Sequence, residues 1–467
     1  MSLSSTAKRN STARAINATA FLLTFGSLFV SASVIMSQTP PRREVVYTSA
    51  MPVPPGATAE DFEPPPTPLE VMEATQDAMG VLQVALGAAR SAIPAIPWNE
   101  HGLAKVEILP DAIRFDEARQ RYVADLPNNH LAVLTLDVLA QRRMEALLSR
   151  YSEPGEAAVV VEAESGRVLV LADGHTGAGV GPGLARRSPA FAASTFKVIT
   201  GAALIAEGHA EPDTTVCFTG GMSGFSLTQL DATETSGNCE TLTEAMSRSS
   251  NLVFGRLADR HLTPEVLQRY ADAFGYNRSI PFEMPLERSR AVIPDNSRLE
   301  FGRSAAGFRH TWLTPLHGAM IQAAIANQGV MMVPTIVDRI EDGQGGVLYE
   351  HEPVEWRTVL SPDVADLVEI TLERTCTQGT ARNFFAERDG WPSDIRVFGK
   401  TGTLSNRPVE GPEPDPLHTF TWFTGYAPHD GGHLAVAGLV VNEPTWWIKG
   451  SYLAAEAVLA TAGQAAE

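Results

Sequence analysis

A serine and a lysine three residues apart, Ser194 and Lys197, stand at the head of an apolar run that ends at Gly208. The run is almost wholly apolar over residues 198–205, which predicts a buried helix. On such a helix the two side chains share one face, with Ser194 at the N-terminus and Lys197 one turn inside. Burial and the positive end of the helix dipole both disfavour an ammonium there. A lysine with a lowered pKa beside a serine hydroxyl is a means of activating that serine as a nucleophile.

Two further motifs follow along the chain. Ser249-Ser250-Asn251 lies in a second helix-like segment, TLTEAMSRSSNLVFGRLA, and Lys400-Thr401-Gly402-Thr403 follows a strand-like approach at residues 395–398. The order S-x-x-K, S-x-N, K-T-G resembles the signature of the penicillin-binding proteins, the serine acyl-transferases that cross-link peptidoglycan. The resemblance extends over roughly residues 130 to 460, and its supporting matches lie at residues 134–145, 313–334, 378–381 and 419–428.

This resemblance implies a serine acyl-enzyme mechanism. Ser194 would attack the carbonyl of the D-Ala-D-Ala peptide bond in a peptidoglycan stem peptide, with Lys197 as the base. Ser249 would relay a proton, and Asn251 would hydrogen-bond the substrate amide. A neighbouring stem-peptide amine would then take the acyl group. The resemblance also implies that β-lactams act as covalent inhibitors and that neither a metal nor an organic cofactor is needed.

The third motif would bind the substrate carboxylate and stabilise the intermediate. Lys400 would add positive charge, while Thr401 and Thr403, on either side of Gly402, would offer hydroxyls to the terminal carboxylate. Backbone N–H groups of Ser194 and Thr403 would form the oxyanion hole that a tetrahedral intermediate requires.

The expected fold class is α+β, with a central antiparallel sheet flanked by helices, as in the penicillin-binding transpeptidases and β-lactamases that the chain resembles. Residues 156–173 alternate as two strands around a turn at Ser165-Gly166, after a helix at residues 136–151. The remaining expected elements are strands at 397–403, 419–425 and 434–441 and a closing helix at 454–460.

The N-terminus carries an export signal. Residues 1–14 hold basic side chains and no acid, and Ala15 to Pro41 contain no charged residue. Residues 15–37 are therefore expected to be a transmembrane signal-anchor, with residues 1–14 cytoplasmic and the rest of the chain outside the cytoplasmic membrane, in the periplasm or its equivalent. A cleaved signal peptide is the alternative, because small residues at 30–33 follow a short apolar core.

Two more segments precede the catalytic region. Residues 38–68 form a proline-rich linker. Residues 69–129 are expected to form a small pedestal, with a helix at 69–91 and strand-like pieces at 104–109 and 120–124; the transpeptidase domain would then span residues 130–467. The pedestal is shorter than the N-terminal module of typical class B relatives and lacks their R-G-x-x-x-D-R pattern. A glycosyltransferase signature is also missing, so the chain resembles a monofunctional enzyme.

Charge and cysteine content narrow the possible partners. A formal net charge of −18 argues against nucleic acid. Cys217 and Cys239 bracket a polar, glycine-rich stretch; in an exported chain a disulfide there would contribute about 3 kcal/mol and leave Cys376 unpaired. Two buried thiols are the alternative.

None of the eleven histidines falls in a metal-ligand pattern. The glycine run at 177–183 favours a flexible loop over a nucleotide site, since no strand leads directly into a helix there.

Three other functions use a similar site. A D,D-carboxypeptidase would have the same residues with water as the acceptor. Class D β-lactamases share the motif STFK but carry a valine-type second motif where this chain has Asn251. Class A enzymes need an E-x-x-L-N motif, which is missing from this sequence. A membrane-anchored β-lactam sensor would need a large cytoplasmic domain. A peptidoglycan D,D-transpeptidase is the expected function, with the cell-wall synthesis machinery as its class of protein partner.

Overall fold

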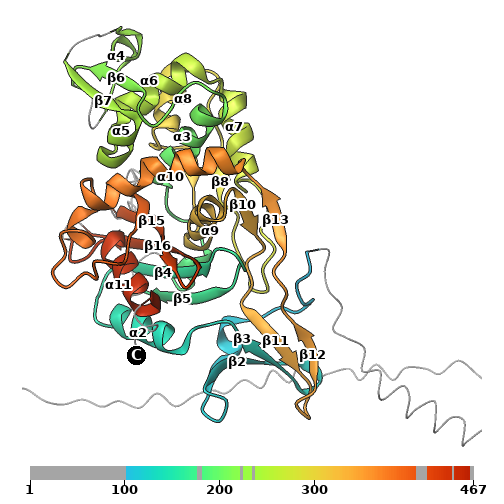
Figure 1. The fold of residues 1–467 in the computed structure, drawn as a ribbon. Helices are drawn as coiled ribbons and strands as arrows, with labels where there is room; N and C mark the ends of the chain where they lie inside the picture. Colours follow the sequence, from blue (N-terminus) through green and yellow to red (C-terminus); the bar gives the residue numbers. More distant parts are fainter. Residues whose placement is uncertain are drawn as a thin grey trace, which may run out of the picture. The chain divides into compact units, whose positions relative to one another are not determined.

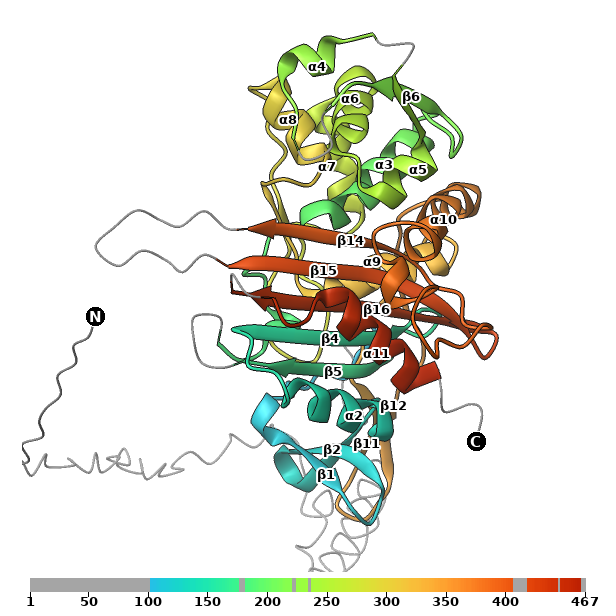
Figure 2. The same cartoon turned by 90° about the vertical axis from the view of Figure 1, so that its left-hand side faces the viewer.

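The computed structural model describes residues 101–175, 181–220, 224–233, 237–405, 418–443 and 446–462. Its largest sheet has five antiparallel strands in the order β14-β15-β16-β4-β5 (Figure 2). The hairpin that begins the catalytic region thus pairs with the last strand of the chain, with Leu434 opposite Glu162 and Val441 opposite Gly155. The strands are β4 (Gly155–Glu162), β5 (Val168–Gly174), β14 (Phe398–Ser405), β15 (Thr419–His429) and β16 (Gly432–Asn442).

Both faces of this sheet are buried, and alternate residues of one strand serve the two faces. In β4, Ala157, Val159 and Val161 belong to one hydrophobic core, whereas Ala158 and Val160 belong to another. This alternation is what the two-residue period of a strand requires. It explains why the strand is a continuous apolar run rather than an alternating one.

Helices cover each face. α2 (Val138–Leu148) and α11 (Gly450–Ala462) lie on one face, against β5 and β16 respectively, and α9 (Pro315–Ala326) lies on the other (Figure 1, Figure 2). α11 approaches β16 closely because Gly438 and Gly450 face each other; a Cβ on either one would overlap the carbonyl oxygen of the other. The start of α11 is thereby fixed near the middle of the sheet.

A mainly helical region packs beyond edge strand β14 (Figure 2). It contains α3 (Lys197–Ala206), α4 (Leu227–Asp231), α5 (Leu242–Arg248), α6 (Asn251–His261), α7 (Pro264–Ala273) and α8 (Arg298–Ala305), with α10 (Pro362–Thr377) against β14. Short antiparallel pairs are β6 (Thr215–Phe218) with β7 (Asn238–Thr241), β8 (Arg290–Ala291) with β9 (Thr311–Trp312), and β10 (Val330–Met332) with β13 (Glu355–Thr358).

A second five-stranded sheet has the order β1-β2-β3-β11-β12. Its strands are β1 (Ile113–Asp116), β2 (Arg121–Leu126), β3 (His130–Leu134), β11 (Val337–Glu341) and β12 (Val347–Glu350). The strand predicted at 120–124 is confirmed as β2, but the one predicted at 104–109 is wrong, since that segment forms only an isolated bridge. The sheet takes strands from both sides of the predicted boundary at residues 129 and 130. Whether residues 69–129 form a unit of their own stays a prediction.

The α+β class, with an antiparallel sheet between helices, is confirmed, as are the strands and helices predicted from residue 136 onward around that sheet. The predicted anchor, the proline-rich linker, the helix at 69–91 and part of the glycine run at 177–183 lie outside the described residues. Within the part of the chain that the structure describes, no helix combines the length and apolar character needed to span a bilayer.

Candidate active site

Ser194 lies in a short 3-10 turn, η5 (Ala193–Phe196), that runs directly into α3. Ala193 has a φ of 51°, a conformation that costs a non-glycine residue about 1–3 kcal/mol. Gly307 packs against this turn so tightly that a Cβ on it would overlap the carbonyl oxygen of Ala193. The predicted helix N-terminus is therefore replaced by a strained turn, held in place by its neighbours, with the helix starting at the lysine.

Lys197 is fully buried, and its Nζ atom meets three oxygen atoms. Nζ lies 2.8 Å from Ser194 Oγ, 2.7 Å from Asn251 Oδ1 and 2.6 Å from the carbonyl oxygen of Ala306. The last two oxygens can only accept hydrogen bonds. In its neutral form the amine can donate its two N–H groups to Asn251 and Ala306 and direct its lone pair at the Ser194 hydroxyl. Lys197 is therefore placed to act as the base that removes the proton of the Ser194 hydroxyl.

The charge state of Lys197 is governed by its surroundings. Burial lowers its pKa well below that of a free lysine, and the positive charge of Lys400 lowers it further. The expected depression of the pKa is confirmed, with burial as the larger cause. A larger neutral fraction near pH 7 follows, which is what a general base requires.

The second motif is a break between two helices, and the single helix that the sequence predicted is wrong. Ser249 has left-handed backbone angles, φ 60° and ψ 40°, between the end of α5 and the start of α6 at Asn251. The reversal brings Ser249 and Asn251 to the same cavity as Ser194, while Ser250 between them is buried. Serine is rarely found in this conformation, so its own residue type gave no signal of the break.

The third motif lies on β14, the edge strand of the main sheet. Lys400 is fully buried and donates to the carbonyl oxygen of Thr401 at 2.8 Å. Burial lowers the pKa of Lys400 to about 7. Thr401 faces the cavity, where its hydroxyl lies 2.6 Å from that of Thr380. Lys400, a titratable cation, therefore lies buried behind the hydroxyl groups of Thr380 and Thr401, which line the cavity.

Gly402 allows β14 to approach the serine turn. A Cβ there would lie 3.2 Å from the carbonyl oxygen of Ala192, from Thr195 Cγ2 and from Trp422 Cβ. Contacts of that length are tighter than a side chain normally makes, so glycine fits best at this position. Thr403, next along the strand, is exposed at the cavity.

The three motifs meet in one cavity of about 360 Å³, between β14 and the helical region. It is lined by six of the predicted site residues, Ser194, Ser249, Asn251, Thr401, Gly402 and Thr403. Lys197 and Lys400 lie buried behind its walls. Six further lining residues were not proposed as site residues from the sequence: Thr380, Phe384, Thr421, Trp422, Lys449 and Ser451. Thr380 lies in the supporting segment 378–381, and Thr421 and Trp422 lie in the segment 419–428, so these segments were a usable signal. Nothing in the sequence indicated Phe384, Lys449 or Ser451.

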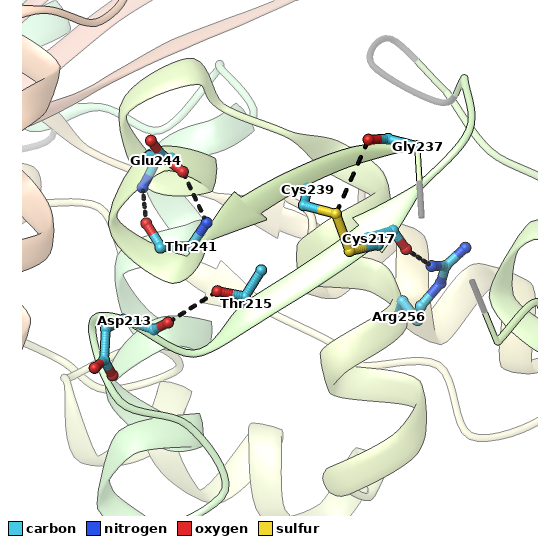
Figure 3. Close-up of a disulfide and its surroundings, with 8 residues drawn as sticks. All are labelled: Asp213, Thr215, Cys217, Gly237, Cys239, Thr241, Glu244 and Arg256. Atoms are coloured by element: carbon cyan, nitrogen blue, oxygen red, sulfur yellow. Dashed lines mark hydrogen bonds between the residues drawn. A yellow bond between two sulfur atoms is a disulfide. The ribbon is translucent and has the colours of Figure 1, made fainter. Parts of the chain in front are cut away.

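The predicted disulfide between Cys217 and Cys239 is confirmed, and it links β6 to β7 at directly opposed positions (Figure 3). Arg256 of α6 is buried and donates to the carbonyl oxygens of Cys217, at 2.7 Å, and Gln229. Cys376 is a free, buried cysteine, as expected. The cross-linked hairpin is thus anchored to the helix that begins with Asn251.

Sequence comparisons identify similar proteins. The family model for the penicillin-binding protein transpeptidase domain matches residues 156–462. Peptidoglycan D,D-transpeptidase PbpA of Mycobacterium tuberculosis is 32% identical over 260 residues, which cover 53% of this chain and 49% of PbpA. Penicillin-binding protein PbpB of Mycolicibacterium smegmatis is 26% identical over 401 residues, covering 76% of this chain and 59% of PbpB. The matched region is about half the length of PbpA.

Solved structures share the fold. A crystal structure of PBPA from Mycobacterium tuberculosis has a TM-score of 0.57 at 22% identity and covers 71% of this chain and 80% of its own. The D,D-transpeptidase domain of a peptidoglycan glycosyltransferase from Eggerthella lenta has a TM-score of 0.56 at 24% identity, with 70% and 82% covered. An imipenem acyl-enzyme complex of the mycobacterial protein has a TM-score of 0.57 at 20% identity, with 70% and 79% covered.

Proposed function

The chain belongs to the family of penicillin-binding protein transpeptidase domains, and from that premise we propose that it is a peptidoglycan D,D-transpeptidase. The observation that carries the proposal is the position of Lys197 Nζ, 2.8 Å from Ser194 Oγ and 2.7 Å from Asn251 Oδ1. A buried amine in contact with both motif residues is suited to remove the serine proton. The names of the curated PbpA relatives and the imipenem acyl-enzyme of a structural neighbour support the same chemistry.

Acylation begins when Ser194 Oγ attacks the carbonyl carbon of the penultimate D-Ala residue while its proton passes to Lys197 Nζ. The oxygen of that carbonyl gains negative charge, which backbone N–H groups of Ser194 and Thr403 stabilise. The C–N bond then breaks, and the proton returns to the departing D-Ala nitrogen through the Ser249 hydroxyl. The Asn251 amide orients Lys197 and binds the substrate amide.

The carboxylate of the departing D-Ala fixes the position of the substrate relative to β14. Thr401 and Thr403 offer hydroxyls to it from β14, and Lys400 supplies positive charge from behind the strand. In the second half-reaction an amine from a neighbouring stem peptide attacks the ester carbonyl and releases Ser194. The proton transfers of acylation are then reversed: Lys197 accepts the proton of the amine and returns it to the serine oxygen.

The division of the chain is part of the proposal. Residues 1–14 are cytoplasmic, residues 15–37 anchor the protein in the cytoplasmic membrane, and residues 38–68 tether the pedestal (69–129) and the catalytic region (130–467) outside it. Fractionation of cells should find the protein in the membrane at its unprocessed mass, with the C-terminus protease-accessible from outside. A shorter mature form released into the soluble fraction would contradict the anchor.

A burst assay with a chromogenic cephalosporin tests the function. A transpeptidase site shields the ester from water and awaits an amine, so one equivalent of chromophore should be released, followed by very slow turnover. A D-Ala-D-Ala-type thioester should be consumed faster when a D-amino acid acceptor is added, with the acceptor found in the product. Sustained cephalosporin turnover would indicate a β-lactamase. Hydrolysis of the thioester with no transfer to the added D-amino acid would indicate a carboxypeptidase.

A further inference from the structure

A second cavity, of about 310 Å³, lies beside the first. It is lined by Tyr151, Phe384, Trp446, Trp447, Ile448, Lys449 and Tyr452, and we refer to it as the aromatic cavity. Phe384 and Lys449 also line the active-site cavity, so the two are neighbours. Five of its seven lining residues carry aromatic rings, and only Lys449 carries a charge. Its volume is at the lower end of the range of about 300–1,000 Å³ that small-molecule sites occupy.

Two exposed indole rings stand on a fixed backbone at this cavity. Trp446 is 39% exposed and Trp447 is 76% exposed. The buried carboxylate of Glu153 accepts a hydrogen bond from the Trp447 backbone N–H at 3.3 Å, and Asn442 Nδ2 donates to the carbonyl oxygen of Ile448 at 2.8 Å. Large apolar rings held in water by an anchored segment are characteristic of a binding surface.

The polar groups of the cavity are hydroxyl groups and one cation. The Tyr151 hydroxyl donates to that of Tyr452 at 3.3 Å, and the two rings meet edge to face with centroids 6.1 Å apart. Lys449 Nζ lies 5.2 Å from the centre of the Trp446 ring. Aromatic faces beside phenol groups suit a ligand that has a flat apolar face and a rim of hydroxyl groups.

We propose that the aromatic cavity binds a pyranose ring of the glycan strand to which the donor stem peptide is attached, an inference that rests on the proposed transpeptidase function. A sugar ring presents C–H groups on its face and hydroxyls on its edge, and it is uncharged where its carboxyl is amide-linked to the peptide. Stem peptides, by contrast, carry free carboxylates and amines, which a cavity with a single charge does not match. A donor held at Ser194 is covalently linked to such a ring, and the cavities adjoin.

The test compares two donors, a disaccharide-linked pentapeptide and the same pentapeptide without sugar. The wild-type protein should have the higher kcat/KM on the disaccharide donor. The Trp447→Ala variant should lose this advantage, with kcat/KM falling about tenfold, the order expected from one aromatic stacking contact. Its kcat/KM on the free pentapeptide and its acylation by penicillin should stay unchanged, because Trp447 does not line the active-site cavity.

Leu139→Ala is the matched control, since Leu139 is 64% exposed on α2 and lines neither cavity. An unchanged donor preference in Trp447→Ala would overturn the glycan proposal. An equal loss on both donors would also overturn it, because the cavity would then bind peptide. Failure of the wild-type protein to react with penicillin at all would refute the proposed function instead, so the two failures are distinguishable.

A different observation carries a second inference, on the residue that positions the second motif. Glu240, on β7, is 4% exposed, and one of its carboxylate oxygens accepts a hydrogen bond from the hydroxyl of Ser250, which is 1% exposed. The other oxygen lies 3.4 Å from Arg248 Nη1. Ser250 is the residue between Ser249 and Asn251, so this buried bond fixes the middle of the motif.

Three consecutive residues of β7 hold this arrangement. Cys239 is cross-linked to β6, and Thr241 caps α5 in a reciprocal box with Glu244 (Figure 3). Glu240, between them, binds Ser250. The break between α5 and α6 is thus fixed from one short strand. We infer that Glu240 is a positioning residue, which keeps the left-handed Ser249 at the active-site cavity and Asn251 in contact with Lys197.

Penicillin acylation kinetics, resolved into the non-covalent dissociation constant and the first-order acylation rate, test this inference. Glu240→Ala should lower the acylation rate about tenfold, as expected when a buried hydroxyl loses its partner, and leave the dissociation constant unchanged. Glu240→Gln, which keeps an acceptor for Ser250, should restore most of the rate. Ser250→Ala should match Glu240→Ala, and the double variant should be no slower, because both remove one interaction.

Glu244→Ala is the matched structural control, because it breaks the cap of α5 without contacting Ser250. All rates are measured at a temperature where circular dichroism shows each variant to be folded. An acylation rate in Glu240→Ala no lower than that of Glu244→Ala would overturn the inference, whether or not both variants are slower than the wild type.

Discussion

Lys197 Nζ lies 2.8 Å from Ser194 Oγ, and of its three oxygen contacts only this one can offer a proton. The side chain is fully buried, and the nearby Lys400 adds to the penalty on its charged form. Nucleophile and base are therefore coupled in the free protein, before any substrate arrives.

Replacing Lys197 by arginine should remove the base and place a permanent positive charge at its position. A guanidinium stays protonated throughout the working pH range, so it cannot accept the serine proton. The acylation rate constant with a fluorescent penicillin should fall by about 10²–10⁴, the usual contribution of general base catalysis. Lys105→Arg, an exchange at an exposed lysine, is the control. Acylation of Lys197→Arg at the control rate would show that some other group deprotonates Ser194.

Lys400→Met should change the pH dependence of the penicillin acylation rate at both its acidic and its alkaline end. Loss of a positive charge near Lys197 stabilises its protonated form and raises its pKa, so the rising limb of acylation should move to higher pH. In the wild type Lys400 has a pKa of about 7, so its charge is lost as pH rises through that value and carboxylate binding should weaken. That falling limb should be absent from the variant. Penicillin acylation rates measured across the pH range test both shifts, and coinciding profiles would refute the prediction.

Much of the fold could be read from the sequence because the signals are local. The hairpin around Ser165-Gly166 and the strands at the third motif are marked by apolar runs and turn residues. The pairing of β3 with β11 was not predicted, since about 200 residues separate them and periodicity carries no information on long-range register. Ser194, Lys197 and Asn251 were identified by their motifs. Ala306 was not, because it contributes only a backbone oxygen to Lys197.

Gly307→Ala should damage the serine turn. Gly307 has a φ of 82°, and a Cβ there would overlap the carbonyl oxygen of Ala193 and approach the Ser194 Cα atom to 3.1 Å. Gly208→Ala is a matched control, since Gly208 has a φ of 71° with open space around it. The control should lose about 1 kcal/mol of folding free energy and acylate normally. Gly307→Ala should lose more and acylate at least tenfold more slowly by the same penicillin assay; equal behaviour of the two would contradict the account of the turn.

Glu156→Gln should stabilise the protein at alkaline pH. Glu156 is 1% exposed, one of its oxygens has no hydrogen-bond partner among the described residues, and burial raises its pKa to about 7. Because this pKa is raised above its unfolded value, the stability of the neutral form is present below the unfolded pKa and is lost as pH rises through about 7.

Urea unfolding should therefore show the Gln variant more stable than wild type at pH 8.5 by about 1–3 kcal/mol and close to it at pH 5. Glu107→Gln, an exchange on the surface, should show no such pH dependence. A constant difference between Glu156→Gln and wild type at both pH values would mean that Glu156 does not titrate in this range.

The central claim is that Ser194 is the residue that becomes acylated, and the most direct measurement is the intact mass of the protein after treatment with penicillin. The wild-type protein should gain one penicillin mass, and peptide mapping should place it on the peptide that contains Ser194. Ser194→Ala should gain none, while Ser149→Ala, an exchange at an exposed serine, should behave as the wild type. Retention of the adduct in Ser194→Ala, or an adduct mapped to a different residue, would contradict the account.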